Sequence, residues 1–212
     1  MKPDFSLYVV TDSNLSRGRS HLEVVRAAIE GGATAIQFRD KHLTSRRFFQ
    51  EGQPLRKLCQ EAGVTFIVND RLDLALALQA DGVHLGPDDL PPAIARGLVP
   101  PGFLIGVSVD NVREACQAAG QGASYLGAGP VFPTRTKLDT GPVLGIPGLA
   151  EIAAAVTLPV VGIGSIGPSN LAQVIATGAA GGAVISAAVA AGDIRQAVAE
   201  MRSIIEAARP AR

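Results

Sequence analysis

The sequence predicts a single-domain (β/α)₈ TIM barrel of the α/β class, occupying residues 1–212. Three observations predict it: eight short apolar or β-branched runs recur along the chain, helical patterns separate them, and no interior stretch resembles a linker. Alternating strands and helices are typical of a parallel sheet, and eight repeats suit a barrel. A doubly wound open sheet alternates in the same way but usually has about five or six strands, so the repeat number favours the barrel.

The expected strands mostly lack strict alternation of polar and apolar residues. This pattern is typical of strands whose outer face is covered by helices. The eight runs are residues 7–10, 35–38, 65–68, 82–85, 104–107, 125–128, 159–163 and 182–185.

Start signals mark several of the helices between these strands. Ser20 opens a capping box, and Asn111 is suited to cap a helix whose apolar stripe includes Cys116. Pro168 suits a first helical turn. Pro54 lies inside another helical pattern, where we expect it to kink or shorten the helix, because proline has no N–H to donate.

Charge and composition exclude several functions. Lysine plus arginine and aspartate plus glutamate both total 19, so the zero net charge argues against nucleic acid as a partner. Residues 152–192 carry no charge, but Pro159, Pro168 and many glycines interrupt them, which indicates buried core and no membrane partner. The first residues show no secretion signal, so we expect a cytoplasmic protein in which Cys59 and Cys116 are reduced core thiols.

Cationic and amide side chains follow the second expected strand. Alternation places Gln37, Arg39 and Lys41 on one side, opposite Phe38. Because catalytic groups of such barrels lie at the carboxyl ends of the strands, this trio would suit phosphate or diphosphate. The alternative is a solvated strand end with a salt bridge from Asp40.

Carboxylates follow the third and fourth expected strands. Asp70 and one of Asp88 and Asp89 could converge to hold Mg²⁺, which proteins usually bind with one or two carboxylates plus water and substrate oxygens. The alternative is that each caps the helix that follows it. His84, within the fourth strand, is better interpreted as a hydrogen-bonded barrel residue than as a metal ligand.

Hydroxyls and glycines follow the later strands. Ser108 ends the fifth strand, and a loop after the sixth carries Thr134, Arg135, Thr136 and Lys137, which could cover a site or be an exposed polar loop. Turns after strands seven and eight, containing Gly164-Ser165 and Ile185-Ser186, present backbone N–H groups of the kind that bind phosphate in these barrels. The sequence has no nucleophile triad, HExxH motif, Walker loop or dinucleotide fingerprint. This inventory suits a reaction with a diphosphate leaving group and Mg²⁺.

From about residue 7 to residue 208 the chain resembles the thiamine-phosphate synthase family. The matching motifs, which are specific only in combination, are Gln37-x-Arg39-x-Lys41, Val68-Asn69-Asp70-Arg71-x-Asp73, Asp81-Gly82-Val83-His84-Leu85-Gly86 with Asp89-Leu90-Pro91, Gly106-x-Ser108, Gly127-x-Gly129-Pro130-Val131-Phe132-Pro133-Thr134-x-Thr136-Lys137, and Ile185-Ser186.

The resemblance implies a transferase that joins hydroxymethylpyrimidine diphosphate to a thiazole phosphate, or to its carboxylated form, and releases diphosphate. It implies a dissociative mechanism through a pyrimidine methyl cation. It also implies roles for individual residues. Arg39, Lys41, Ser108 and Lys137 would be catalytic and, with Gln37 and Asn69, would hold the pyrimidine diphosphate. Asp70 and Asp89 would bind Mg²⁺. The thiazole phosphate would be held by Thr134, Arg135, Thr136, Gly164, Ser165, Ile185 and Ser186.

Two positions depart from the family pattern. Ser165 stands where the family usually has a second glycine, so a turn that needs positive φ would be strained there. Pro87 stands where glutamine is frequent and removes one N–H beside the acidic loop.

Three other functions compete with the synthase. A thiazole tautomerase of the same superfamily would typically lack the metal carboxylates and carry histidine in place of Pro130. A phosphate-sensing barrel without activity would have no reason to keep the carboxylate pair. An unrelated isomerase or lyase would need a base in the barrel, for which Lys137 is the one candidate. The sequence leaves open whether the barrel forms a homo-oligomer.

Overall fold

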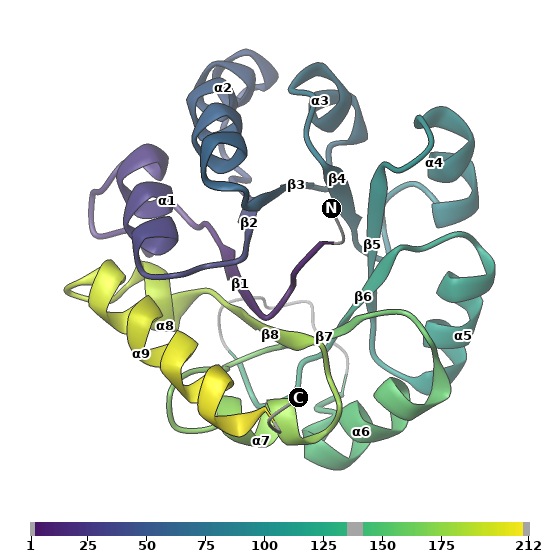
Figure 1. Cartoon of the computed structure of the whole chain (residues 1–212). Helices are drawn as coiled ribbons and strands as arrows, with labels where there is room; N and C mark the ends of the chain where they lie inside the picture. Colours follow the sequence, from purple (N-terminus) through teal and green to yellow (C-terminus); the bar gives the residue numbers. More distant parts are fainter. Residues whose placement is uncertain (1–2, 135–141, 210–212) are drawn as a thin grey trace.

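The computed structural model, which describes residues 3–134 and 142–209, confirms the (β/α)₈ barrel. Eight strands form a closed sheet in sequence order, and all neighbours, including the closing pair β1 and β8, are parallel. Helices lie around the outside of this sheet (Figure 1). Each strand therefore delivers its carboxyl end to the same end of the barrel, where residues distant in sequence meet.

The observed strands closely match the expected runs. β3 is longer by Asn69 and β5 by Ser108 and Val109, β7 begins one residue later, and β8 begins and ends one residue earlier than expected. The strands are β1 Leu7–Val10, β2 Ala35–Phe38, β3 Thr65–Asn69, β4 Gly82–Leu85, β5 Leu104–Val109, β6 Tyr125–Ala128, β7 Val160–Ile163 and β8 Gly181–Val184. The helices are α1 His21–Glu30, α2 Ser45–Ala62, α3 Leu72–Ala77, α4 Pro92–Leu98, α5 Val112–Gly120, α6 Gly145–Ala155, α7 Leu171–Ala176, α8 Ser186–Val189 and α9 Ile194–Ala208.

Two apolar layers hold the barrel together. Alternate residues of each strand point outward, so Leu7 and Val9 join a large core shared with the helices, whereas Tyr8 and Val10 join a smaller cluster inside the barrel. The inner cluster contains Phe5, Tyr8, Val10, Ala35, Ile67, Tyr125, Val161 and Ala183. Polar side chains placed at inward positions beyond this cluster therefore face the open, carboxyl-terminal end.

The predicted helix caps are present. Ser20 and Glu23 form the capping box of α1, with both reciprocal hydrogen bonds made. Asn111 accepts from the Glu114 N–H at 2.9 Å at the start of α5. These caps satisfy backbone donors that have no partner within the helix, and so fix where each helix begins.

Two of the helices differ from the expected ones. Pro54 does not shorten α2, which runs on both sides of it, because the proline lies on the exposed face, where water can satisfy the carbonyl left without a partner. Cys116 is exposed, and Ala118 instead faces the core from α5; only Cys59 is buried. Pro168 lies in the turn directly before Leu171, as expected, and the Leu171 N–H donates to the Gly167 carbonyl at 3.0 Å across this turn. Within the described residues, no helix is both long and apolar enough to span a membrane.

Candidate active site

A cavity of about 280 Å³ lies at the carboxyl ends of the strands and brings together most of the site residues expected from the sequence. Its walls come from all eight strands or the loops that follow them. The expected residues that line it are Gln37, Arg39, Lys41, Asn69, Asp70, Ser108, Thr134, Gly164, Ser165, Ile185 and Ser186. Asp89 stands behind the cavity wall at Gly86, whose N–H donates to the Asp89 carboxylate at 2.7 Å. Arg135, Thr136 and Lys137 lie outside the described residues.

Arg39 is fixed at the end of β2 by its backbone and its side chain. Its backbone N–H donates to Thr11 Oγ1 at 2.9 Å, and its guanidinium forms a 2.8 Å ion pair with the carboxylate of Asp12. The alternative of a solvated end with an Asp40 salt bridge is not what the structure shows, since Arg39 pairs with Asp12. The guanidinium is 17% exposed, so it keeps access to the cavity it lines.

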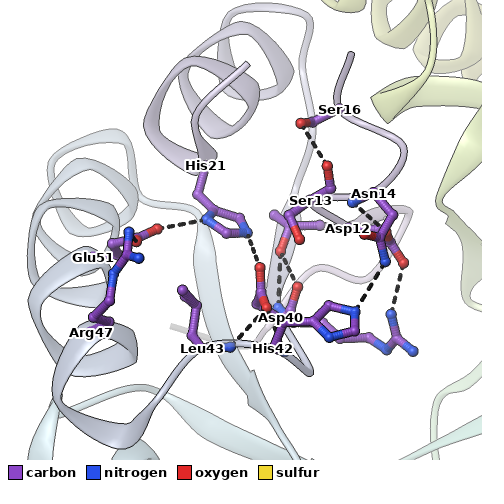
Figure 2. A network of polar contacts seen from close by, with 12 residues as sticks. Asp12, Ser13, Asn14, Ser16, His21, Asp40, His42, Leu43, Arg47 and Glu51 are labelled. Carbon is purple, nitrogen blue, oxygen red and sulfur yellow. Dashed lines mark hydrogen bonds and ion pairs between the residues drawn. The ribbon is translucent and has the colours of Figure 1, made fainter. Parts of the chain in front are cut away.

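The carboxylate of Asp40 organises the loop between β2 and α2 (Figure 2). It accepts from the backbone N–H groups of His42 and Leu43, at 2.8 and 3.1 Å, and its other oxygen lies 3.4 Å from His21 Nε2. His21 in turn contacts Glu51 of α2 at 2.9 Å. This network closes the loop that carries Lys41 into a fixed turn between α1 and α2.

The charge of Asp40 is stabilised by this network. Burial of the side chain raises its pKa, but hydrogen bonds from Ser13, His42 and Leu43 and the nearby His21 outweigh burial, so the pKa lies below its ordinary value. The carboxylate is therefore ionised at neutral pH although it is only 3% exposed. It acts as an anchor within the protein, and neither Asp40 nor His21 lines the cavity.

Asp70 and Asp89 form a close carboxylate pair at the ends of β3 and β4. Burial, the charge of Asp89 and a hydrogen bond shared with Asp89 together raise the pKa of Asp70 to about 6, although Lys41 and Arg39 act in the opposite direction. Asp70 also has a φ of 61°, in the left-handed region. Two neighbouring carboxylates supply the oxygen ligands that Mg²⁺ binds in proteins, so this pair could hold a divalent metal. Among residues 3–134 and 142–209, no group of three or more metal-ligating side chains is present.

Neither acidic residue caps the helix that follows it. The residue at the start of α3 is Arg71 and that at the start of α4 is Pro91, and neither helix has a side-chain cap. The capping alternative for Asp70 and Asp89 is therefore wrong.

The turn after β7 has the positive φ angles that would strain a serine at position 165. Gly164 has a φ of 109°, and a Cβ there would lie 2.8 Å from Pro130 Cα, so this position requires glycine. Ser165 has a φ of 48°, and its hydroxyl donates to the Pro133 carbonyl at 2.6 Å. The left-handed serine is thus held by a hydrogen bond to the loop that follows β6.

The floor of the cavity contains polar residues that the sequence analysis did not assign to the site. Tyr8 and His84 line it, and Tyr125 lies directly behind them, hydrogen-bonded to both. The interpretation of His84 as a hydrogen-bonded barrel residue is confirmed. The sequence predicts Tyr8 and Tyr125 only as strand residues, because a tyrosine within an apolar run does not show which way its hydroxyl points.

Fold and site together define the class of protein: a (β/α)₈ barrel with a polar cavity at the carboxyl ends of its strands, the end at which enzymes of this fold carry their catalytic groups. The family model described as thiamine monophosphate synthase matches residues 7–188. Curated proteins named thiamine-phosphate synthase are similar along nearly the whole length. The protein from Chloroflexus aurantiacus is 50% identical over 202 residues, 95% of this chain and 93% of that one. The protein from Moorella thermoacetica is 50% identical over 207 residues, 98% of this chain and 99% of that one.

The chain therefore belongs to the thiamine monophosphate synthase family. Its structure is similar to that of a thiamine phosphate pyrophosphorylase from Pyrococcus furiosus, with a TM-score of 0.90 and 45% identity, covering 97% of this chain and 98% of that one. A 3-hexulose-6-phosphate synthase shares the fold alone, with a TM-score of 0.71 and 17% identity. As a member of this family, the chain is an enzyme, a transferase of thiamine biosynthesis.

Proposed function

We propose that this barrel joins 4-amino-2-methyl-5-hydroxymethylpyrimidine diphosphate to 4-methyl-5-(2-phosphoethyl)thiazole, or to its carboxylated form, giving thiamine phosphate and diphosphate. The observation that carries this proposal is the composition of one cavity. Cationic Arg39 and Lys41, the Asp70 carboxylate and the glycine-containing turn at Gly164 all line it. The two substrates carry three phosphoryl groups between them, and the cavity offers one environment for the diphosphate and another for the single phosphate.

Arg39 and Lys41 are assigned to the diphosphate. The ion pair with Asp12 holds the Arg39 guanidinium in place, and the turn anchored by Asp40 holds the backbone of Lys41. Ordering these side chains before the ligand binds lowers the entropy that binding costs. Gln37, Asn69 and Ser108 complete this part of the cavity, and Lys137 is proposed to join them from outside the described residues.

Asp70 and Asp89 are assigned to Mg²⁺. Their carboxyl groups are close enough to share a hydrogen bond. Burial and, after it, the charge of Asp89 raise the pKa of Asp70, and a bound cation would oppose this rise. This donor set therefore fits a hard divalent ion that keeps water and phosphate oxygens as further ligands. When bound, Mg²⁺ supplies positive charge that stabilises the departing diphosphate.

The second phosphate is assigned to the side of the cavity formed by β6, β7 and β8. Gly164, Ser165, Ile185 and Ser186 line this side, and Thr134 faces them from the loop after β6. The first N–H groups of a helix have no partner within it, so those at the start of α8 are available to an anion. Arg135 and Thr136 are proposed to contribute to binding the same phosphate.

The reaction that this arrangement suits is dissociative. The bond between the pyrimidine methylene carbon and the diphosphate oxygen breaks, and both electrons leave with the diphosphate. The lone pair of the thiazole nitrogen then forms the new carbon–nitrogen bond to the resulting cation. Arg39, Lys41 and Lys137 would stabilise the charge that develops on the leaving group, and Ser108 would position the pyrimidine end.

Incubation with both substrates and Mg²⁺, with diphosphate measured over time, tests the proposal. Release should require both substrates and be abolished by a chelator and by Asp70→Ala, while Glu61→Gln, an exposed carboxylate on α2, should keep full activity. Binding without release would support a sensing barrel instead, and full activity of Asp70→Ala would contradict the metal assignment.

A further inference from the structure

A continuous line of hydrogen bonds crosses the inside of the barrel beneath the cavity. Gln37 Nε2 donates to Tyr8 Oη at 3.0 Å, and the hydroxyls of Tyr8 and Tyr125 lie 2.9 Å apart. Tyr125 Oη lies 3.0 Å from His84 Nδ1, and His84 Nε2 lies 3.0 Å from Ser108 Oγ. The two ends of the line, Gln37 and Ser108, both line the cavity. It therefore connects two residues assigned to the same substrate through the barrel interior.

Two strand glycines make the space for this line. A Cβ at Gly106 would lie 2.4 Å from Tyr125 Oη and 2.5 Å from His84 Nδ1, at the contact between these two atoms. A Cβ at Gly127 would lie 2.8 Å from His84 Cε1. Any larger residue at either position would push His84 out of place, so the line depends on the backbone of β5 and β6 as well as on its own members.

Each hydroxyl of the line has one hydrogen to give, so the line can run in a single direction from Gln37 to Ser108. An amide nitrogen only donates, so Tyr8 accepts from Gln37 and has its own hydrogen available for Tyr125. Burial raises the pKa of both tyrosines well above the ordinary value, so both hydroxyls keep their hydrogens at neutral pH. If Tyr125 donates to His84 Nδ1, the hydrogen of the neutral imidazole lies on Nε2, where Ser108 Oγ accepts it.

We propose that Tyr8, Tyr125 and His84 are positioning residues. The two tyrosines hold His84 as the neutral Nε2–H tautomer, and His84 in turn makes the Ser108 hydroxyl a donor toward the cavity. Ser108 already accepts from His84, so its own hydrogen is left for a ligand. The oxygens and ring nitrogens of a pyrimidine diphosphate are hydrogen-bond acceptors. A hydroxyl that is fixed as a donor therefore favours such a ligand over one without an acceptor at that position. This ligand side of the inference rests on the proposed function, whereas the tautomer does not.

Nitrogen-15 NMR of the ligand-free enzyme tests the tautomer directly. The chain has 3 histidines, so loss of one signal set in His84→Gln assigns the resonances. At neutral pH, Nδ1 of His84 should have the shift of an unprotonated imidazole nitrogen and Nε2 that of a protonated one. The opposite pattern, or an imidazolium, would overturn the proposal. The tautomer itself is read from the wild-type enzyme, and the His84→Gln variant serves only to assign the signals.

Tyr125→Phe tests the coupling, because it removes one hydroxyl from a residue that does not line the cavity. We expect a mixture of His84 tautomers and a rise of about ten-fold in KM for the pyrimidine diphosphate, with KM for the thiazole phosphate changed less than about two-fold. The control is Phe5→Leu, which removes the ring stacked 4.3 Å from Tyr125 but leaves the line intact and should leave the tautomer unchanged.

An unchanged tautomer in Tyr125→Phe, or an equal rise in both KM values, would overturn the positioning role. If the wild-type enzyme releases no diphosphate, the proposed function fails. The tautomer of His84 then still tests the direction of the hydrogen bonds from Gln37 to Ser108.

Discussion

The hydroxyl of Ser165 donates a 2.6 Å hydrogen bond to the backbone carbonyl of Pro133. The bond joins the turn after β7 to the loop after β6, one residue before Thr134. It also accompanies a left-handed backbone, with a φ of 48° at Ser165. One side chain therefore offsets the strain of its own backbone by tying together two segments of the proposed phosphate site.

Ser165→Ala and Ser165→Gly separate these two effects. The alanine variant keeps the strain and loses the hydrogen bond, so we expect a loss of about 1 kcal/mol in the free energy of unfolding. The glycine variant loses the bond but relieves strain of about 1 kcal/mol, so its stability should stay close to wild type. Urea unfolding measures both. Equal destabilisation of the two variants would show that the left-handed serine is not strained.

Asp70→Asn should stabilise the enzyme in the absence of metal while abolishing its activity. The pKa of Asp70 is raised from 3.8 to about 6, so between these pH values the folded protein holds a proton that the unfolded chain has lost. Stability from this group therefore falls as pH rises through the window and stays low above it. Asparagine removes the charge and can donate to Asp89. Allowing for solvent screening, we expect a gain of about 1 kcal/mol at pH ~8.

Thermal unfolding in a chelator across this pH range measures the effect. The stability difference between Asp70→Asn and wild type should shrink toward acidic pH, where the wild-type carboxyl is already neutral. A difference that is constant with pH would contradict the raised pKa.

Asp40→Asn should weaken binding at the cationic side of the cavity. The asparagine oxygen can keep part of the turn, but the negative charge beside His21 and the two loop N–H groups is lost. We expect KM for the pyrimidine diphosphate to rise about ten-fold through misplacement of Lys41, with a loss of about 1–3 kcal/mol in stability. Steady-state kinetics with each substrate varied in turn gives the first value. A rise confined to the thiazole phosphate would contradict the assignment of this loop.

The two cysteines should differ in reactivity. Cys116 is exposed, whereas Cys59 is buried and its pKa is raised to about 12, chiefly by burial. A thiol reagent should therefore modify Cys116 quickly in the native enzyme and Cys59 only after unfolding. Mass spectrometry of the modified peptides identifies the site, and Cys116→Ser should abolish the fast reaction.

The positions of the strands could be predicted from the sequence because β-branched runs and helix caps are local signals. The pattern also placed Gln37 opposite Phe38, since alternation along a strand is fixed by geometry. The line from Tyr8 through Tyr125 to His84 could not be predicted, because it depends on the register between strands far apart in sequence and on space left by Gly106. The exposure of Cys116 was missed for a related reason: helical spacing fits more than one face of a short helix such as α5.

Closure of the sheet between β1 and β8 has a consequence for how the chain folds. Leu7 pairs with Gly182, and Val9 with Val184, so the last seam joins residues separated by most of the sequence. Contacts between such distant segments are slow to form, and until they do the sheet has two open edges that can pair with other molecules. We therefore expect a nascent or truncated chain lacking β8 to aggregate rather than to persist as a partial barrel.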